Sequence, residues 1–177
     1  FSPEDLLVNS LNWSIPENNL IQIADQFVRL EEFRFSRENQ ELHIRDDLAD
    51  IESEHLAILF TGFQMETFVN LLNPKESIAG GSMNGRLVLE NLFGATGLLG
   101  DLRIDSLKVF EIPLGNFNLN ARSETLGDYV LALSLKDGGM DLDMAGDFQA
   151  NEAGGTFDAQ LDLNQLDMEV LAGLSGG

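Results

Sequence analysis

The feature that most constrains this chain is an alternation of apolar and polar residues with a period of two. A β-strand turns successive side chains to opposite faces of its sheet, so each alternating stretch predicts a strand with one dry face and one wet face. The clearest stretch is FDAQLDL at residues 157–163, and similar stretches recur from residue 33 onward. The pattern therefore predicts an all-β fold.

Turn-forming residues separate these stretches. They include Gly80-Gly81, Gly127-Asp128, Asp137-Gly138-Gly139 and Pro113 with Gly115. Runs of strand residues punctuated in this way are typical of consecutive antiparallel strands. We predict about six successive strands between residues 82 and 163, arranged as a meander.

Two short segments break the alternation and carry apolar residues at helical spacing. They are Met65–Leu72 and Met168–Leu174, and both begin with Met-Glu. We interpret them as an internal repeat in which strands are followed by a short amphipathic helix. The chain then reads as one segment with two parts: strands plus a helix over 1–75, and the meander plus a helix over 76–177.

Two short helices cannot cover the dry face of so many strands. Either the sheet rolls onto itself, or it folds into a sandwich, or it stays open and leaves an apolar trough. The alternation pattern leaves these arrangements open, and an open apolar trough would be a binding surface. The alternative is a closed β-sandwich that serves as a surface adhesin or a carbohydrate-binding module.

Composition narrows the function. The 177 residues are 44% hydrophobic and 23% charged, which is typical of a folded chain. With 30 acidic and 10 basic residues the formal charge is −20, so nucleic acid and anionic surfaces are poor partners. The absence of cysteine excludes disulfides, thiol catalysis and zinc-thiolate sites. Because the chain begins at Phe1, we expect it to be a piece of a longer protein.

The chain offers no motif for catalysis, a cofactor or a metal. His43 and His55 have no serine or acid at a catalytic spacing, so we expect no enzyme activity. Strand-forming residues interrupt the acidic cluster, which rules out the tight loop that calcium requires; its members are Asp137, Asp141, Asp143 and Asp147. We therefore predict no catalytic residue, no cofactor and no metal.

Several segments together resemble the TamB family of translocation and assembly module proteins, in its Bacteroidetes form. The likeness covers nearly the whole chain and rests on the order and spacing of these segments: 84–87 (NGRL), 93–97 (FGATG), 100–104 (GDLRI), 113–116 (PLGN), 137–142 (DGGMDL), 146–148 (GDF) and 163–168 (LNQLDM). Members are AsmA-like proteins that are anchored in the inner membrane and extend through the periplasm.

The resemblance implies a fold and a role. The implied fold is a long sheet bent into a U, called a β-taco, with an apolar concave face. With this resemblance we predict an all-β fold built on a curved, open antiparallel sheet with two short helices. The role is outer-membrane biogenesis, through phospholipid transport, assembly of outer-membrane β-barrel proteins, or both. The implied partners are phospholipid acyl chains or unfolded outer-membrane protein strands, with an Omp85-type barrel reached through the parent protein. The implied location is the periplasm, and the implied role is not enzymatic.

A hydrophobic groove of this kind needs a continuous dry surface, since each exposed CH₂ costs about 0.8 kcal/mol. We predict that twelve residues from the dry faces of the strands form it: Leu87, Leu89, Leu102, Ile104, Phe117, Leu119, Leu131, Leu133, Leu142, Met144, Phe157 and Leu161. The sequence does not distinguish an open groove from a sealed core at these positions.

Overall fold

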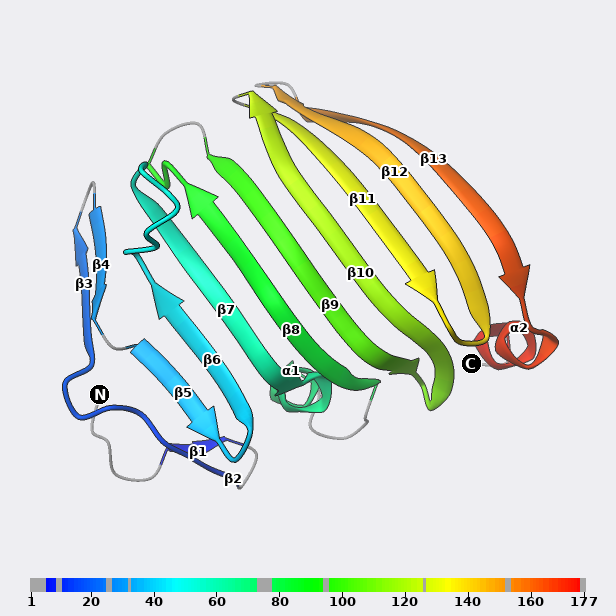
Figure 1. Ribbon diagram of the computed structural model, residues 1–177, viewed down its shortest axis with the longest axis horizontal. Coiled ribbons are helices and arrows are strands. Elements are labelled where there is room, and N and C mark those ends of the chain that lie inside the picture. The colour runs from blue at the N-terminus through cyan, green and yellow to red at the C-terminus, as the bar shows by residue number, and fades with distance from the viewer. Residues whose placement is uncertain are drawn as a thin grey trace.

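The computed structural model describes residues 6–8, 11–24, 27–31, 33–72, 78–93, 96–125, 127–151 and 154–175. Nine strands form one antiparallel sheet in chain order (Figure 1). They are β5 (Phe33–Arg37), β6 (Gln40–Arg45), β7 (His55–Gln64), β8 (Ala79–Glu90), β9 (Gly97–Val109), β10 (Ile112–Thr125), β11 (Asp128–Lys136), β12 (Met140–Asn151) and β13 (Gly154–Leu166).

This sheet is open, with β5 at one edge and β13 at the other. The predicted open antiparallel sheet is confirmed, and so is the meander, whose six strands are β8 to β13. The closed β-sandwich is wrong for the described residues, because these nine strands lie in a single sheet. The two predicted parts of the chain share this sheet, since β7 pairs directly with β8.

Two small hairpins precede the sheet. One pairs β1 (Leu6–Val8) with β2 (Leu11–Trp13), and the other pairs β3 (Leu20–Ala24) with β4 (Phe27–Glu31). Just after β2, the backbones of Ser14 and Ser36 exchange two hydrogen bonds of 2.9 and 3.0 Å. The first hairpin is thereby attached to β5, which is an edge strand of the large sheet.

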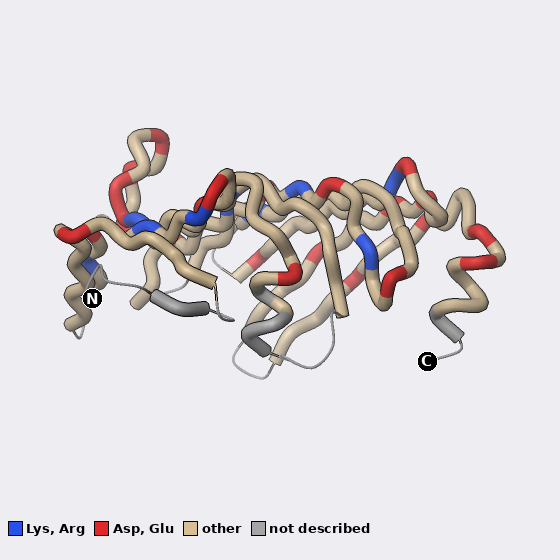
Figure 2. Tube along the Cα trace, turned by 90° about the horizontal axis from the view of Figure 1, so that it is seen from below, with Lys and Arg blue, Asp and Glu red and all other residues tan. Residues whose placement is uncertain are grey.

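The two helices lie where the sequence predicts them. Helix α1 (Met65–Leu72) follows β7, and α2 (Met168–Ser175) follows β13. Viewed from below, the sheet forms a shallow arch with both helices beneath it (Figure 2). Each helix therefore follows a run of adjacent strands, β5 to β7 for α1 and β8 to β13 for α2. Both helices lie on the same face of the sheet.

Two predicted turns are wrong. Gly80-Gly81 lies inside β8, and Pro113 with Gly115 lies inside β10. Gly81 and Gly115 have φ values of 133° and 119°, and both stand at irregularities in the strand register, so these glycines serve bulges. The real turn between β9 and β10 is Phe110-Glu111, which has positive φ without any turn-forming residue.

Candidate functional site

One face of the sheet carries apolar side chains in rows that cross the strands. The central row takes one residue from each of the nine strands, paired in register: Phe35, Leu42, Phe60, Gly85, Leu102, Leu119, Leu133, Met144 and Leu161. Eight of these nine residues are apolar and large. We call this side of the sheet the apolar face.

Parallel rows flank the central row. Toward the helices the next row is Phe63, Met83, Ile104, Phe117, Leu135, Leu142 and Leu163. On the other side the next row is Phe33, Ile44, Ile58, Leu87, Gly100, Ala121, Leu131, Gly146 and Ala159. Beyond it, Tyr129, Phe148 and Phe157 pair across β11 to β13, and Leu56, Leu89 and Leu98 pair across β7 to β9. All twelve residues predicted for the groove lie on this face.

The first hairpin covers the apolar face over β7, β8 and β9. Trp13 is only 4% exposed and packs with Phe60, Phe63 and Met83 in the main core. The rings of Trp13 and Phe63 are 5.7 Å apart between centroids. The indole Nε1 of Trp13 is buried and has no hydrogen-bond partner among the described residues. Trp13 therefore stabilises this region by apolar contact alone.

Helix α2 covers a second region, near the ends of β10, β11 and β12. Val170 is 2% exposed and forms a smaller core with Leu114 and Leu135, and Leu142 packs against it. Helix α1 contributes Met65 to the main core. The helices thus lie over the strand ends next to the row that runs from Phe63 to Leu163, and no described helix lies over the opposite strand ends.

The apolar face is open toward β13. Phe157, Leu161 and Leu163 are exposed by 51%, 58% and 49%. Leu131, Leu133 and Met144 on the neighbouring strands are half-buried. Large exposed apolar patches on protein surfaces are typical of binding surfaces.

The predicted groove is therefore divided between core and open surface. Leu102 and Ile104 are buried beneath the first hairpin, and Leu142 packs under α2. The open part contains Leu131, Leu133, Met144, Phe157 and Leu161 from the prediction. Sequence reasoning left out Leu163, although it continues the alternation of 157–163.

Tyr129 and Phe148 also belong to the open part and were left out of the prediction. The hydroxyl of Tyr129 donates a hydrogen bond of 2.7 Å to the backbone oxygen of Thr96, and its ring lies 5.9 Å from that of Phe148. Tyr129 has the same strand parity as Leu131, and that parity was the signal available in the sequence.

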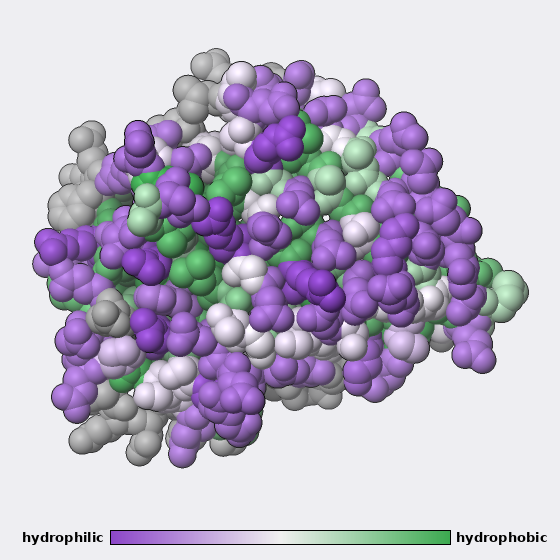
Figure 3. All heavy atoms as spheres, viewed as in Figure 1, coloured by the Kyte–Doolittle hydropathy of each residue, from purple (hydrophilic) through white to green (hydrophobic). Residues whose placement is uncertain are grey.

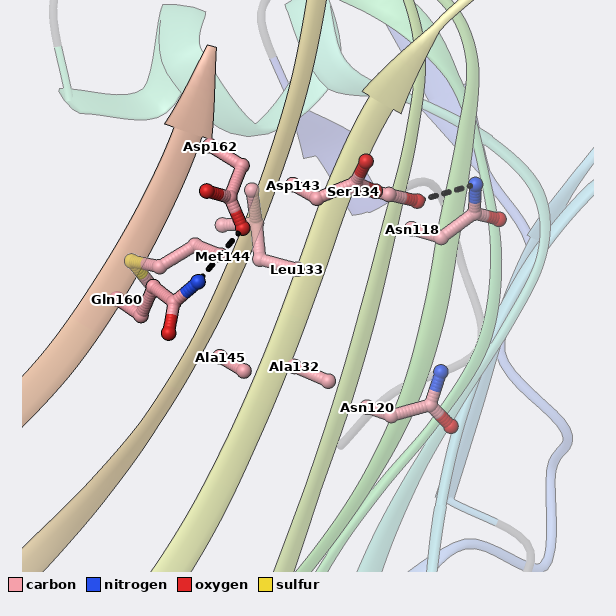
Figure 4. A pocket seen from close by; sticks show the side chains of 10 residues that line it. All are labelled: Asn118, Asn120, Ala132, Leu133, Ser134, Asp143, Met144, Ala145, Gln160 and Asp162. Carbon is pink, nitrogen blue, oxygen red and sulfur yellow. Dashed lines mark hydrogen bonds between the residues drawn. The ribbon is translucent and has the colours of Figure 1, made fainter. Parts of the chain in front are cut away.

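The opposite face of the sheet is mainly polar (Figure 3). A shallow cavity of about 420 Å³ lies there over β10 to β13 (Figure 4). Ala132 and Ala145 form its floor, and polar side chains surround them: Asn118, Asn120, Ser134, Asp143, Gln160 and Asp162. These amides, carboxylates and one hydroxyl can exchange hydrogen bonds, but no histidine lines the cavity as a general base.

Lys136 neutralises part of the acidic cluster. Its ammonium contacts the carboxylates of Asp141 and Asp143, the latter at 2.7 Å. Hydrogen bonds from Lys136 and then from Asn164 lower the pKa of Asp141, and the same carboxylates raise the pKa of Lys136. Among the described residues, no group of three or more acidic or histidine side chains converges to hold a metal ion.

The two histidines have different environments. His43 lies on the polar face, between Arg34 and Leu59 in the strand register. His55 is 4% exposed, where Nε2 accepts a hydrogen bond of 2.9 Å from the backbone N–H of Leu48. Its Nδ1 lies 2.7 Å from the backbone oxygen of Ser53. His55 therefore fastens the loop before β7, a role that the sequence did not indicate.

Comparisons with known proteins add no assignment to this geometry. No family model, no curated protein and no solved structure matches the chain. In the described part of the chain, no helix is both long and apolar enough to cross a membrane.

Proposed function

We propose that this chain is one segment of a non-enzymatic periplasmic trough that shields phospholipid acyl chains from water during outer-membrane biogenesis. The observation that carries the proposal is the apolar face itself, whose central row is continuous over nine strands and ends at the exposed Leu161; Phe157, on the same strand and face, is also exposed. The TamB resemblance supports the same role and supplies the location.

The energetics of the open region favour an apolar ligand. Phe157, Leu161 and Leu163 already lie in water, and an acyl chain laid over them removes its own methylene groups from water as well. Each methylene group transferred contributes about 0.8 kcal/mol. A passive surface of this kind needs no catalytic group, and the direction of transport depends on other parts of the parent protein.

A second candidate cargo is an unfolded strand of an outer-membrane protein. The specific observation in its favour is that no described strand pairs with the outer edge of β13. An extended chain can add to such an edge through backbone hydrogen bonds while its apolar side chains continue the rows of the apolar face.

The test is photo-crosslinking in the intact protein in its host cell. A photoreactive amino acid replaces Leu161 or Leu133 on the apolar face, and Gln160 on the polar face is the matched control next to Leu161. We expect phospholipid adducts at Leu161 and Leu133 but not at Gln160. Adducts only to outer-membrane proteins would favour the second cargo. Crosslinks confined to the chain itself would refute an open trough.

A further inference from the structure

The first hairpin, formed by β1 and β2, lies on the apolar face where a ligand of that face would lie. Trp13 packs in one core cluster with Phe60 and Leu102, which belong to the central row. The same row continues through β10 to Leu133 and Met144, which are only half-buried. The hairpin therefore covers one stretch of an apolar surface that continues beyond it.

The first hairpin is only lightly attached to the large sheet. Among the described residues, the backbone hydrogen bonds that join the two are the pair between Ser14 and Ser36. Its two strands pair over three residues each, and an isolated hairpin of this kind is marginally stable in water. Elements with few backbone bonds to their surroundings open at a lower free energy than the strands of a large sheet. The apolar contacts of the hairpin therefore carry most of its attachment.

Those apolar contacts include a polar group that is buried at a cost. The indole Nε1 of Trp13 has no hydrogen-bond partner among the described residues. A buried donor without a partner has lost its hydrogen bond to water and gained nothing in exchange. When the hairpin moves away from the sheet, the indole regains that bond. The covered state is therefore weaker than it would be with a wholly apolar side chain of the same size.

We propose that the first hairpin is a displaceable cover of the apolar face, and that an acyl chain takes the place of Trp13 over β7 to β9. An acyl chain consists only of apolar groups, so it covers Phe60 and Met83 without burying a donor. The hairpin and the acyl chain exclude each other, because both need the same rows of side chains. Ile15 follows Ser14 and is 4% exposed, so it keeps the chain attached while the hairpin moves.

This inference rests on the proposed function for its ligand, and it adds control over access to the apolar face. When a site is open only part of the time, the apparent affinity of its ligand falls by the open fraction. The hairpin therefore lowers the affinity for acyl chains over β7 to β9 and leaves the surface beyond β10 unaffected. By the same coupling, a bound acyl chain holds the hairpin away from the sheet.

The composition of the chain makes the hairpin easy to follow. Trp13 is the only tryptophan, so tryptophan fluorescence reports on the first hairpin alone. The probe is dodecylphosphocholine below its micelle-forming concentration, and hexylphosphocholine is the control with the same headgroup and a shorter chain. Quenching of Trp13 by acrylamide measures how far the indole is exposed to water. Titration calorimetry measures binding of the probe independently.

A disulfide can lock the hairpin in place, because the chain has no cysteine of its own. The locking variant is Ser14→Cys/Ser36→Cys, whose backbones exchange both hydrogen bonds. Such pairs have a Cα separation of about 5.5 Å, which suits a disulfide. The matched control is Asn118→Cys/Ser134→Cys, which joins β10 to β11 on the polar face and leaves the hairpin unlocked. Each variant is measured oxidised and reduced, and circular dichroism checks that it keeps its strands.

We expect dodecylphosphocholine to raise the quenching of Trp13 severalfold in the unsubstituted chain and in the control variant, and hexylphosphocholine to leave it unchanged. In the oxidised locking variant, quenching stays low and the probe binds severalfold more weakly, and reduction restores both.

Three results would overturn the inference. They are binding of dodecylphosphocholine while Trp13 stays shielded, a quenching response that survives the oxidised lock, and loss of that response in the oxidised control variant as well. The first result leaves the proposed function intact, because acyl chains would then bind only beyond the hairpin. Absence of any binding in the calorimeter would refute the proposed function and this inference together.

Discussion

Replacing Trp13 tests how much the first hairpin stabilises the protein by covering the apolar face over β7 to β9. Trp13 is only 4% exposed, so its side chain is almost fully buried. A tryptophan buries up to about 250 Å², which at about 25 cal/mol per Å² gives an upper bound of about 6 kcal/mol. The unpartnered Nε1–H offsets about 1–3 kcal/mol of this, because its lost hydrogen bond to water is not replaced. We therefore expect Trp13→Ala to lower the free energy of unfolding by about 3–5 kcal/mol.

Trp13→Phe separates the two contributions. Phenylalanine keeps most of the apolar contact with Phe60 and Phe63 and removes the unpartnered donor, so the loss and the gain nearly cancel. We expect the free energy of unfolding of this variant to stay within about 1 kcal/mol of that of the unsubstituted protein. The measurement is urea unfolding followed by far-ultraviolet circular dichroism, since Trp13 is the only tryptophan and its fluorescence is lost.

Either of two outcomes would refute this reasoning. If Trp13→Ala loses less than about 1 kcal/mol, the first hairpin does not contribute to the main core as the contacts indicate. If Trp13→Phe is as damaging as Trp13→Ala, the indole N–H makes a stabilising interaction and the apolar account fails. Apolar dye binding supplies a further check, because Trp13→Ala should uncover Phe60 and Phe63 and raise dye fluorescence.

Three further predictions concern the sheet, the charges and the open face. Gly85→Ala should destabilise by about 2 kcal/mol or more in urea unfolding, because φ is 121° and an added Cβ overlaps the backbone of β9; a neutral result would mean that β8 can shift. Lys136→Met should lower the urea midpoint most between pH 3.8 and pH 10.5. The stability that comes from the lowered pKa of Asp141 is lost as pH falls through that pKa, and the stability that comes from the raised pKa of Lys136 is lost as pH rises through that pKa. If the loss of stability in Lys136→Met does not change with pH, the ion pair is contradicted. Leu161→Asp should weaken binding of an apolar dye several-fold while Gln160→Asp leaves it unchanged, and equal effects would show that net charge, not the apolar face, controls the dye.

Period-two alternation was enough to predict the apolar face. It places Leu133 and Leu161 on one side and Ala132 and Gln160 on the other, and antiparallel register then aligns the strands into rows. The two helices were also predictable, because their apolar spacing differs from that of the strands. Alternation indicates on which face of the sheet a side chain lies. It does not indicate whether another part of the chain covers that face.

Coverage depends on contacts between distant parts of the chain. Trp13 buries Leu102 and Ile104, and Val170 covers Leu135, although nothing local in the sequence marks these pairs. The turn at Phe110-Glu111 was missed for a related reason. Both residues adopt positive φ because the long strands on either side impose the turn, which overrides local preference.

The meander also makes the length of the apolar face additive. Adjacent strands lie about 4.8 Å apart, so each hairpin lengthens the face by about 10 Å and adds two residues to every row. Because strand direction alternates, removing β11 and β12 together would bring β10 beside β13 in antiparallel orientation, with Leu119 facing Leu161 in the central row. Deleting one strand alone would break this match. The sheet can therefore become longer across its strands, or shorter, in units of one hairpin without a change in its cross-section.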